Sequence, residues 1–352
     1  SGNYIVGSEA IDFVQYGTSK ELNEEKNGFP TLRLNEFDSF FIAEPQKYCD
    51  KINGETFENL KLRKGDVLIC RTNGNPKFVG KSAIKMENYE YAYASYFFKI
   101  RPRLSIINSA VLVVYLNSEL GRKEIEKFSM TSNQTNFSPA KFREIRIPVI
   151  NQNLLKIIDH IVEKSFLNLE SSKFLYSQSE QFFLSELGIL DWKPKYELTY
   201  VKNYSDTQKS ERFDAEYFQP KYEEIIEAVK KYKGGFDELG NLVKIKDKNF
   251  TPKGNETYKY IELANISSNG EINGYTENFG NELPSRARRK VQKGDVIISS
   301  IEGSLESIAL ITENWTNILC STGFFVVNSD KINSETLLVL LKTKVGQLQL
   351  KK

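Results

Sequence analysis

The chain has 352 residues, of which 40% are hydrophobic and 27% charged, and its formal net charge is +2. This length and composition predict a soluble globular protein with two domains of ordinary size. No apolar run approaches the ~20 residues of a membrane helix, and no signal-peptide core follows the first residues, so we expect a cytoplasmic protein without a membrane segment. The net charge is too small to identify a nucleic-acid partner by itself.

Residues that often serve in metal binding and nucleophilic catalysis are few. Cys49, Cys70 and Cys320 are scattered without a Cys-x-x-Cys pair, which favours a reducing compartment and argues against a zinc site. The single histidine, His160, lies in a long helical segment, and any histidine-dependent catalytic group would have to assemble around it. We expect unreactive core thiols, no metal site and no catalytic residues.

The first part of the chain predicts short strands joined by polar loops. Residues 4–30 look irregular, and Thr31–Leu34 is expected to form a short strand. The sequence Lys64-Gly65-Asp66 predicts a turn, and the apolar run Val67–Cys70 after it is typical of a buried strand. A further strand is expected over Ala92–Ile100.

A polar loop follows the strand Val67–Cys70 and is the first candidate site. Its cationic and amide side chains lie at the end of a rigid strand, where recognition residues are commonly presented; they are Arg71, Asn73, Asn75, Lys77 and Lys81. Beyond it we expect an amphipathic helix over Ser109–Phe128, a polar loop over Met130–Phe137, and a closing segment over Ile145–Pro148.

A segment without proline or glycine runs from Asn151 to Leu187 and predicts one long helix. Asn151 is suited to cap its start and Gly188 to end it, which makes the helix roughly 54 Å long at ~1.5 Å per residue. Apolar residues recur along it at the coiled-coil period, and we expect them to pair with another helix: Leu155, Val162, Leu169, Tyr176 and Phe183. A long amphipathic core helix is the alternative.

Similar sequences lie on the two sides of this helix. Leu62–Ile69 resembles Val291–Ile298 at an offset of 291 − 62 = 229 positions, and Leu112–Gly121 resembles Leu337–Gly346 at 346 − 121 = 225. A period this long predicts duplicated domains. We therefore expect a first domain over 1–150, a spacer helix over 151–188, and a connector with the second domain over 189–352.

The second copy differs from the first in its loops and in its length. Its expected loop 283–293 holds a dense basic cluster, and 298–304 takes the place of the Arg71 loop with hydroxyl groups and one carboxylate. The cluster contains Arg286, Arg288, Arg289 and Lys290. Six residues follow Gly346, so we expect an incomplete second copy without a second long helix. Either the polypeptide is cut short, or its spacer helix pairs with that of a second copy.

The side chains in these loops suit DNA, whereas common catalytic motifs are absent from the sequence. Arginine can pair with guanine, and asparagine or glutamine with adenine, while lysine and arginine neutralise phosphates. The candidate base contacts are Arg71, Asn73, Asn75, Asn133, Gln134 and Asn136, and the candidate phosphate contacts are Lys77, Lys81 and the basic cluster. Turn chemistry is the alternative for the amides, and a solvated loop for the cluster.

The order of these motifs resembles the DNA specificity subunit of type I restriction-modification systems. The resemblance covers essentially the whole chain and rests on the duplication, on the long helix and on the segments Lys64–Gly74, Val79–Lys81, Leu112–Gly121, Asn133–Gln134, Ile147–Pro148 and Arg212–Tyr222. It implies an α+β fold class, with two repeated α/β target-recognition domains that have mostly β cores, separated by a long coiled-coil-type helix.

The resemblance also implies a function and partners. Each domain would read one half of a split site in double-stranded DNA, and the helix would set the gap between the halves. In this family the subunit is not an enzyme and holds no cofactor. It recruits methyltransferase subunits, which carry S-adenosylmethionine, and through them a restriction and translocase subunit.

Two other functions stay open. The chain could be the recognition portion of a fused type II restriction-methyltransferase enzyme, which an upstream Asn-Pro-Pro-aromatic motif in the parent gene would support. It could instead be a coiled-coil scaffold that binds only protein, in which case specific retention on DNA would not occur.

Overall fold

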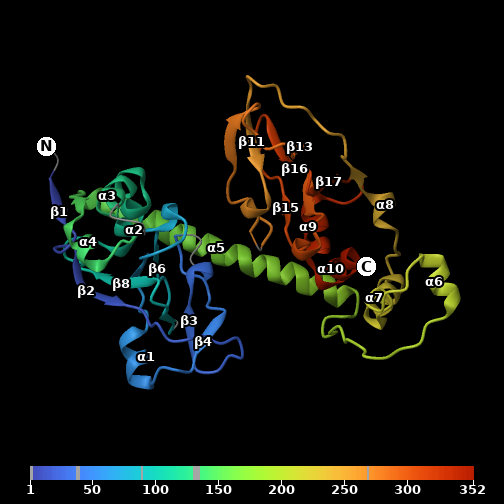
Figure 1. The fold of residues 1–352 in the computed structure, drawn as a ribbon, viewed down its shortest axis with the longest axis horizontal. Helices are drawn as coiled ribbons and strands as arrows, with labels where there is room; N and C mark the ends of the chain where they lie inside the picture. The colour runs from blue at the N-terminus through green and yellow to red at the C-terminus, as the bar shows by residue number, and fades with distance from the viewer. Residues whose placement is uncertain (1–2, 37–39, 89, 130–134, 268) are drawn as a thin grey trace. The chain divides into compact units, whose positions relative to one another are not determined.

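The computed structural model of the chain contains a long helix, α5 (Gln152–Glu186), which in sequence joins two sheet-rich parts (Figure 1). The structure describes all residues except 1–2, 37–39, 89, 130–134 and 268. Its compact units are Ser1–Glu170 and Ser171–Lys352, called unit 1 and unit 2 below. The predicted α+β fold class is confirmed.

Unit 1 is built on a four-stranded antiparallel sheet of order β2-β8-β5-β6, formed by β2 (Ile11–Tyr16), β8 (Phe97–Pro102), β5 (Val67–Cys70) and β6 (Ser82–Ile84). A smaller sheet has the order β4-β3-β7, with β3 parallel to β7; its strands are β4 (Lys47–Cys49), β3 (Phe29–Leu32) and β7 (Ala92–Tyr93). β1 (Tyr4–Val6) pairs with β9 (Arg146–Pro148). The helices are α1 (Gly54–Leu60), α2 (Ser109–Asn117), α3 (Glu119–Ser129) and α4 (Pro139–Glu144), with 3₁₀ turns η1 (Leu34–Glu36) and η2 (Pro76–Phe78).

The central strand β5 is apolar throughout because both of its faces are covered. Val67 and Ile69 belong to one core cluster, which α2 closes by packing on β6 and β8. Leu68 and Cys70, on the opposite face, belong to a second cluster. An uninterrupted apolar run is the pattern expected of a strand that is buried on both faces.

Unit 2 contains two four-stranded sheets. The first has the order β10-β17-β14-β15 and is formed by β10 (Lys244–Ile245), β17 (Phe324–Asn328), β14 (Val296–Ser299) and β15 (Ile308–Leu310). The second has the order β12-β11-β16-β13 and is formed by β12 (Thr276–Phe279), β11 (Thr257–Ile261), β16 (Ile318–Ser321) and β13 (Ala287–Lys290). The helices are α6 (Tyr204–Ser210), α7 (Pro220–Lys230), α8 (Leu239–Leu242), α9 (Ser334–Lys342) and α10 (Lys344–Lys351), with 3₁₀ turns η3 (Leu263–Asn265) and η4 (Glu302–Ser304).

Both units contain the same turn before their central strand. The carboxylate of Asp66 accepts a hydrogen bond of 2.9 Å from the backbone N–H of Arg63, and Asp295 accepts one of 2.9 Å from Gln292. Both aspartates are 0% exposed. The three-residue return from carboxylate to N–H closes the turn, so the aspartate organises the backbone that leads into β5 or β14.

The glycines of these turns are held against the start of a helix. Gly65 has a φ of +87° and Gly294 a φ of +88°, a left-handed conformation that favours glycine. Their carbonyls accept hydrogen bonds of 2.6 Å from Ser109 Oγ of α2 and Ser334 Oγ of α9, respectively. The predicted duplication is therefore present in three dimensions as matching hydrogen bonds, in addition to matching sequence.

The expected helix Ser109–Phe128 is wrong as a single element, because it breaks at Ser118 into α2 and α3. Ser118 Oγ donates to the carbonyl of Tyr115 at 2.7 Å and accepts from the N–H of Gly121 at 3.2 Å. α2 is buried on nearly all sides, so it is not amphipathic either. In unit 2 Thr343 separates α9 from α10 with the same two bonds.

Three further expectations are corrected. The segment 4–30 is not irregular, since it contains β1, β2 and the start of β3. The expected strand Ala92–Ile100 is divided into β7 and β8 by a turn at Ala94, whose carbonyl accepts from the N–H of Phe97 at 3.1 Å. The basic segment 283–293 is partly a strand, β13, which forms one edge of its sheet.

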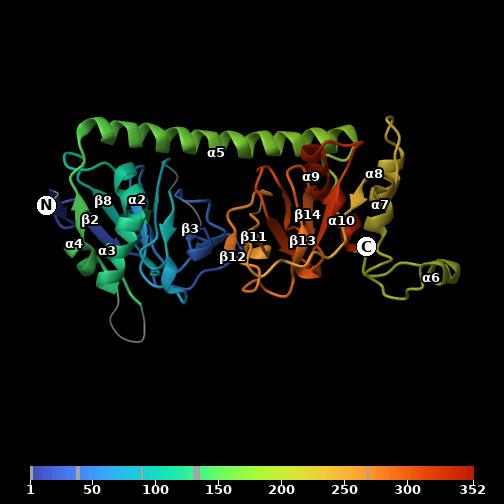
Figure 2. The ribbon, with the colours of Figure 1, turned by 90° about the horizontal axis from the view of Figure 1, so that it is seen from above.

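The predicted long helix is confirmed, and Figure 2 shows α5 without interruption. Asn151 Oδ1 accepts from the N–H of Leu154 at 2.9 Å, and Gly188, with a φ of +66°, ends the helix. The expected pairing residues pack partly on their own chain: Leu155 and Val162 are buried, and Leu169, Tyr176 and Phe183 are half-buried. A neighbouring stripe is exposed instead, formed by Leu154, Ile157, Ile161, Leu175 and Phe182.

Candidate nucleic-acid interface

Arg71 stands directly after β5 and is held by its backbone. Its N–H donates to the carbonyl of Tyr96 at 2.7 Å, and its own carbonyl accepts from the N–H of Phe137 at 2.9 Å. The guanidinium carbon lies 5.4 Å from the ring centroid of Tyr16. Arg71 Nε is buried and has no hydrogen-bond partner among the described residues. The side chain is therefore positioned by an aromatic ring and retains an unused donor.

The asparagines of the Arg71 loop stabilise its turns. Asn73 Oδ1 accepts from the N–H of Asn75 at 2.8 Å, and Asn75 Oδ1 accepts from Lys77 at 3.0 Å and caps η2. Turn chemistry, the alternative considered from sequence, thus accounts for one interaction of each side-chain oxygen. The amide NH₂ groups form no part of these turns, and base contact by Asn73 and Asn75 stays a prediction.

The cations of the loop differ in their surroundings. Lys77 is exposed on η2, whereas Lys81 is half-buried with Nζ 4.4 Å from the ring centroid of Phe78. Arg122 of α3, which the sequence did not single out, donates to the carbonyls of Lys77 at 3.0 Å and Val79 at 2.7 Å. These two bonds fix the backbone of the loop. Arg122 follows Gly121 on α3, and nothing in the sequence around it distinguishes it from other helical arginines. Its role in holding the Arg71 loop could therefore not be predicted from sequence.

The second predicted amide segment lies beside the Arg71 loop. Asn136 and Thr72 form an isolated antiparallel bridge, and the exposed Asn136 accepts a hydrogen bond on its carbonyl from Lys141 Nζ at 2.9 Å. Asn133 and Gln134 fall outside the described residues. The structure thus brings Arg71 and Asn136 to one edge of unit 1 through backbone pairing between segments that are distant in sequence.

The basic cluster of unit 2 is arranged along β13. Arg286 precedes the strand with 63% of its side chain exposed, and its Nη2 lies 4.0 Å from a carboxylate oxygen of Glu262. Arg288 Nε donates to the carbonyl of Ser285 at 2.9 Å. Arg289 is half-buried, and its Nη1 has no partner among the described residues. Lys290 is exposed, with Nζ 3.8 Å from the ring centroid of Phe250.

The position of Arg71 is taken in unit 2 by Ser300. Its N–H donates to the carbonyl of Gly323 at 2.9 Å, and its Oγ donates to the same carbonyl at 2.9 Å. The exposed residues that follow are Ile301 and Glu302. Arg71, beside the ring of Tyr16 in unit 1, is therefore replaced in unit 2 by the hydroxyl of Ser300, and an aliphatic residue and a carboxylate follow it.

The cysteines are part of the core. Cys49, Cys70 and Cys320 are buried and free. Burial raises the pKa of Cys70 to about 11 and that of Cys320 to about 12, so both are protonated at neutral pH.

His160 is exposed on α5. Within the described residues, no helix has the length and apolarity needed to cross a membrane.

Comparisons with known proteins give matches among solved structures. No protein-family profile and no curated protein matches the sequence. The chain is similar to the S subunit of a type I restriction-modification system from M. genitalium, with 14% identity and a TM-score of 0.43, covering 99% of this chain and 78% of that one. It is also similar to the HsdS subunit from Thermoanaerobacter tengcongensis, with 13% identity and a TM-score of 0.35, covering 98% and 80%.

A third similar structure belongs to a larger protein. The type IIG restriction endonuclease BpuSI matches with 11% identity and a TM-score of 0.36, covering 46% of this chain and 26% of that one. The first two structures are subunits of the family that the sequence motifs resemble.

Proposed function

We propose that this chain is the DNA-recognition subunit of a type I restriction-modification system, in which each unit reads one half of a split DNA site. The observation that carries the proposal is a shared framework with unlike loops. Asp66 and Asp295 hold equivalent turns, yet the residues after the following strands are Arg71 in one unit and Ser300 in the other. Two copies of one scaffold with different recognition chemistry suit a bipartite target.

In unit 1 the base-reading role falls to Arg71. Its backbone is fixed by two hydrogen bonds and its guanidinium is held beside the ring of Tyr16, a placement that suits a bidentate contact with the major-groove edge of guanine. Asn136 lies on the adjacent strand-like segment, where an amide could read adenine. Lys77 is exposed beside them and suits a phosphate.

In unit 2 the cations of β13 are proposed to contact phosphates. Lys290 is exposed at the end of the strand, Arg288 and Arg289 are half-buried, and Arg286 just before the strand is exposed. Such contacts supply affinity that depends on salt and carry no sequence information by themselves.

The proposed partners are methyltransferase subunits, which carry S-adenosylmethionine, and through them a restriction and translocase subunit. The exposed stripe of α5 supports the presence of a helical partner. It contains Leu154, Ile157, Ile161, Leu175 and Phe182, each at least 43% exposed. An exposed apolar stripe on a long helix, here interrupted between Ile161 and Leu175, is a common mark of pairing, either with a second copy of this helix or with a partner subunit.

The test is to sequence adenine methylation in a host that expresses this chain with its neighbouring methyltransferase gene. We expect a split motif, and Arg71→Ala should relax specificity at one position of one half only. Arg143→Ala, at an exposed arginine of the same unit, is the matched control and should leave the motif unchanged.

Other outcomes would redirect the assignment. If assembled complexes produced no methylation that depends on this chain, and purified chain did not bind DNA specifically, the protein-only scaffold would be favoured. A loss of both halves of the motif in Arg71→Ala would contradict the assignment of one half to unit 1.

A further inference from the structure

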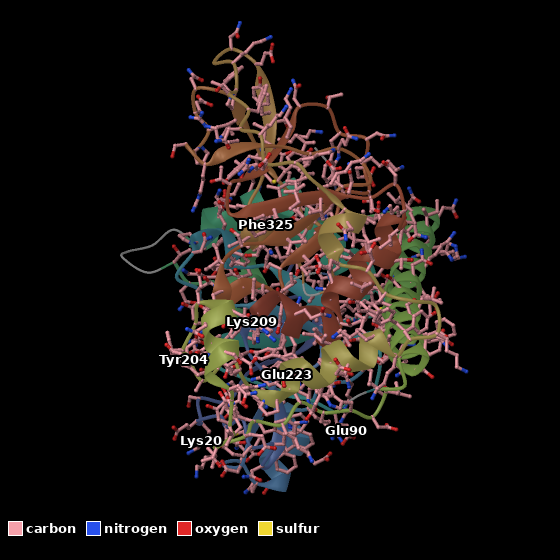
Figure 3. The ribbon with its side chains drawn as sticks, turned by 90° about the vertical axis from the view of Figure 1, so that its right-hand side faces the viewer. Lys20, Glu90, Tyr204, Lys209, Glu223 and Phe325 are labelled. Atoms are coloured by element: carbon pink, nitrogen blue, oxygen red, sulfur yellow. The ribbon has the colours of Figure 1, made fainter. Side chains whose placement is uncertain are left out.

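The strands that lead to the two candidate recognition loops are paired in the same register. Phe98 of β8 lies opposite Ile69 of β5, and Phe325 of β17, which Figure 3 labels, lies opposite Ile298 of β14. The residues that follow β5 and β14 therefore start from equivalent places in the two units.

One backbone hydrogen bond closes each loop. The N–H of Cys70 donates to the carbonyl of Lys81 at 2.8 Å, and the N–H of Ser299 donates to the carbonyl of Ser307 at 3.0 Å. The closing residues are 81 − 70 = 11 positions apart in unit 1 and 307 − 299 = 8 positions apart in unit 2. The Arg71 loop therefore corresponds to residues 300–306, called the Ser300 loop below, although it is longer.

A side chain from a neighbouring helix holds the end of the 3₁₀ turn in each loop. Arg122 Nη2 of α3 donates to the carbonyl of Val79, directly after η2, at 2.7 Å. Gln347 Nε2 of α10 donates to the carbonyl of Leu305, directly after η4, at 3.3 Å. Unlike side chains thus make the same contact in the two units, and they are called the anchors below.

The anchors occupy the same position in the repeat. Each directly follows a glycine, and 347 − 122 = 225 equals the offset between Gly121 and Gly346, 346 − 121 = 225. A Cβ on Gly121 would lie 2.0 Å, and one on Gly346 would lie 2.3 Å, from a carbonyl oxygen of the preceding helix. Because glycine permits this close approach, it fixes the place from which the next side chain leaves the helix.

Each anchor makes a second bond and leaves one polar atom unpaired. Arg122 Nη2 also donates to the carbonyl of Lys77 at 3.0 Å, and Gln347 Nε2 also donates to the carbonyl of Leu341 at 2.9 Å. Arg122 Nη1 and Gln347 Oε1 are buried and have no hydrogen-bond partner among the described residues. A buried polar atom without a partner lowers stability, so stability alone does not explain a polar anchor in both units.

The helices that carry the anchors are fixed to the core. Ile125 of α3 and Leu155 of α5 belong to one buried cluster, and Val345 of α10 and Leu184 of α5 belong to another. The anchors therefore leave packed helices, whereas the carbonyls of Val79 and Leu305 belong to loops. Hydrogen bonds from a packed element restrict the positions that a loop can take.

We propose that Arg122 and Gln347 are positioning residues for the reading of DNA, each acting on the loop of its own unit and neither touching a base. Arg122 sets discrimination in the half-site read by unit 1, and Gln347 sets it in the half-site read by unit 2. The effect on DNA rests on the proposed function, whereas the holding of the loops is a property of the free chain. Base contacts need a placement within about 0.5 Å, so a displaced loop loses discrimination before it loses affinity for phosphates.

The test compares substitutions by their capacity to donate hydrogen bonds. Arg122→Met and Gln347→Met keep an unbranched side chain but remove the donors. The reciprocal substitutions Arg122→Gln and Gln347→Arg give each position the anchor of the other unit, and both keep a donor. Arg143→Met and Gln349→Met, both at exposed residues, are the matched controls.

Hydrogen exchange of the free full chain tests the holding of the loops. Arg122→Met should raise the exchange rate of the Val79 and Gly80 amides by about tenfold, while the amides of β5 stay unchanged and report intact folding. Gln347→Met should do the same for the amides of the Ser300 loop, with β14 as the reference. The controls and the reciprocal substitutions should exchange as the unchanged chain does.

Methylation by the chain assembled with its methyltransferase tests the consequence for DNA. Rates are compared on a duplex that carries the complete motif and on duplexes with one base pair changed in one half. Arg122→Met should lower the ratio of these rates by about tenfold for the half that Arg71→Ala affects, and Gln347→Met should do so for the other half. A loss of folded protein would lower every rate alike and leave the ratios unchanged. The reciprocal substitutions should restore the ratios.

Three results would overturn the proposal. One is unchanged exchange of the loop amides in both methionine variants, and another is faster exchange without a change in the ratios. The third is an equal effect of one variant on both halves of the motif. If the unchanged complex methylated all duplexes alike, the proposed function would fail and the role in DNA reading with it, while hydrogen exchange alone would still decide whether the anchors hold the loops.

Discussion

The carboxylate of Asp66 is fully buried and accepts two hydrogen bonds from the guanidinium of Arg101, from Nε at 2.8 Å and from Nη2 at 3.0 Å. In unit 2 the equivalent Asp295 accepts from Lys246 Nζ at 2.7 Å and 2.9 Å. The cations come from different strands: Arg101 lies on β8, whereas Lys246 follows β10. The two copies therefore neutralise the same buried charge from different elements.

Asp66→Asn should destabilise unit 1 by about 2–4 kcal/mol, because the charge that balances Arg101 and half of the acceptor capacity are lost in a buried site. Unfolding of unit 1 is followed by hydrogen exchange of the β5 amides at increasing urea concentration. Both tryptophans, Trp192 and Trp315, lie in unit 2. Their fluorescence reports the unfolding of unit 2 in the same sample, which should not change.

The matched control for this change is Asp12→Asn, which removes the carboxylate of the exposed pair with Arg103. An exposed pair contributes about 0–1 kcal/mol, so protection of β5 should hardly change. Equal effects of the two substitutions would show that burial of Asp66 has no energetic consequence.

Gly121→Ala should destabilise unit 1 by about 1–3 kcal/mol, because the new methyl group must displace backbone. A Cβ at this position would lie 2.0 Å from the carbonyl oxygen of Tyr115. Gly54→Ala, where no atom lies within 4 Å of the new Cβ, should be neutral or stabilising. Chemical denaturation followed by circular dichroism compares the two, and similar midpoints would contradict the close approach of α2 and α3.

Lys99 should make the stability of unit 1 rise with pH in alkaline solution. Its Nζ donates to the carbonyls of Asn59, Leu60 and Lys61, at the end of α1, and burial lowers its pKa from 10.5 to about 8. Between these values the unfolded chain holds a proton that the folded chain has released, so the free energy of unfolding increases with pH. Below about pH 8 both states are protonated, and the cost of burying the charge is constant.

Lys99→Met should reduce this rise by about 2 kcal/mol between pH 8 and pH 10. The readout is the pH dependence of the unfolding free energy, because the substitution also removes three hydrogen bonds and lowers stability at every pH. Lys123→Met, at an exposed lysine of α3, should keep the slope of the unchanged chain. Parallel curves for all three chains would disprove the role of Lys99.

The double change Leu175→Gln and Phe182→Gln should weaken self-association of the chain by about tenfold or more, because both side chains belong to the exposed stripe of α5. They are 58% and 70% exposed, so folding should not suffer. Sedimentation equilibrium measures the association. Leu104→Gln, at a residue that is 75% exposed elsewhere in unit 1, should change nothing. A monomeric unchanged chain would refute pairing between copies.

Lys290→Ala should lower affinity for all DNA sequences alike and reduce the slope of log K against log salt by about 1, as expected for one lost phosphate contact. The prediction rests on the proposed function. Binding titrations at several salt concentrations, with specific and random duplexes, provide the test. Lys230→Ala, on α7 and 47% exposed, is the control. A larger loss on the specific duplex would instead assign Lys290 to base reading.

Several features could be predicted because they depend on local sequence. The bounds of α5 follow from the absence of proline and glycine, from capping by Asn151 and from the left-handed Gly188. The turn before β5 and its counterpart before β14 follow from the same Lys-Gly-Asp sequence, whose aspartate reaches an N–H only three residues away. Interactions within one turn of chain need no tertiary partner.

Other features depended on partners that are distant in the chain. Ala92–Ile100 has strand-forming residues throughout, and its division into β7 and β8 arises because the two halves pair with different sheets. The approach of Asn136 to the Arg71 loop depends on a bridge between positions 136 − 72 = 64 residues apart. Local propensity contains no information about such pairing.

The sequence by itself determined that two copies of one framework flank a long helix, since repeated residues at constant spacing repeat their local bonds. Only the tertiary structure decided what each copy exposes. Phe98 and Phe325 are the same residue at the same place, yet one is 0% and the other 52% exposed. The physical reason is that burial depends on what packs against a side chain, and the rings of Phe137 and Phe142 reach only the first of them.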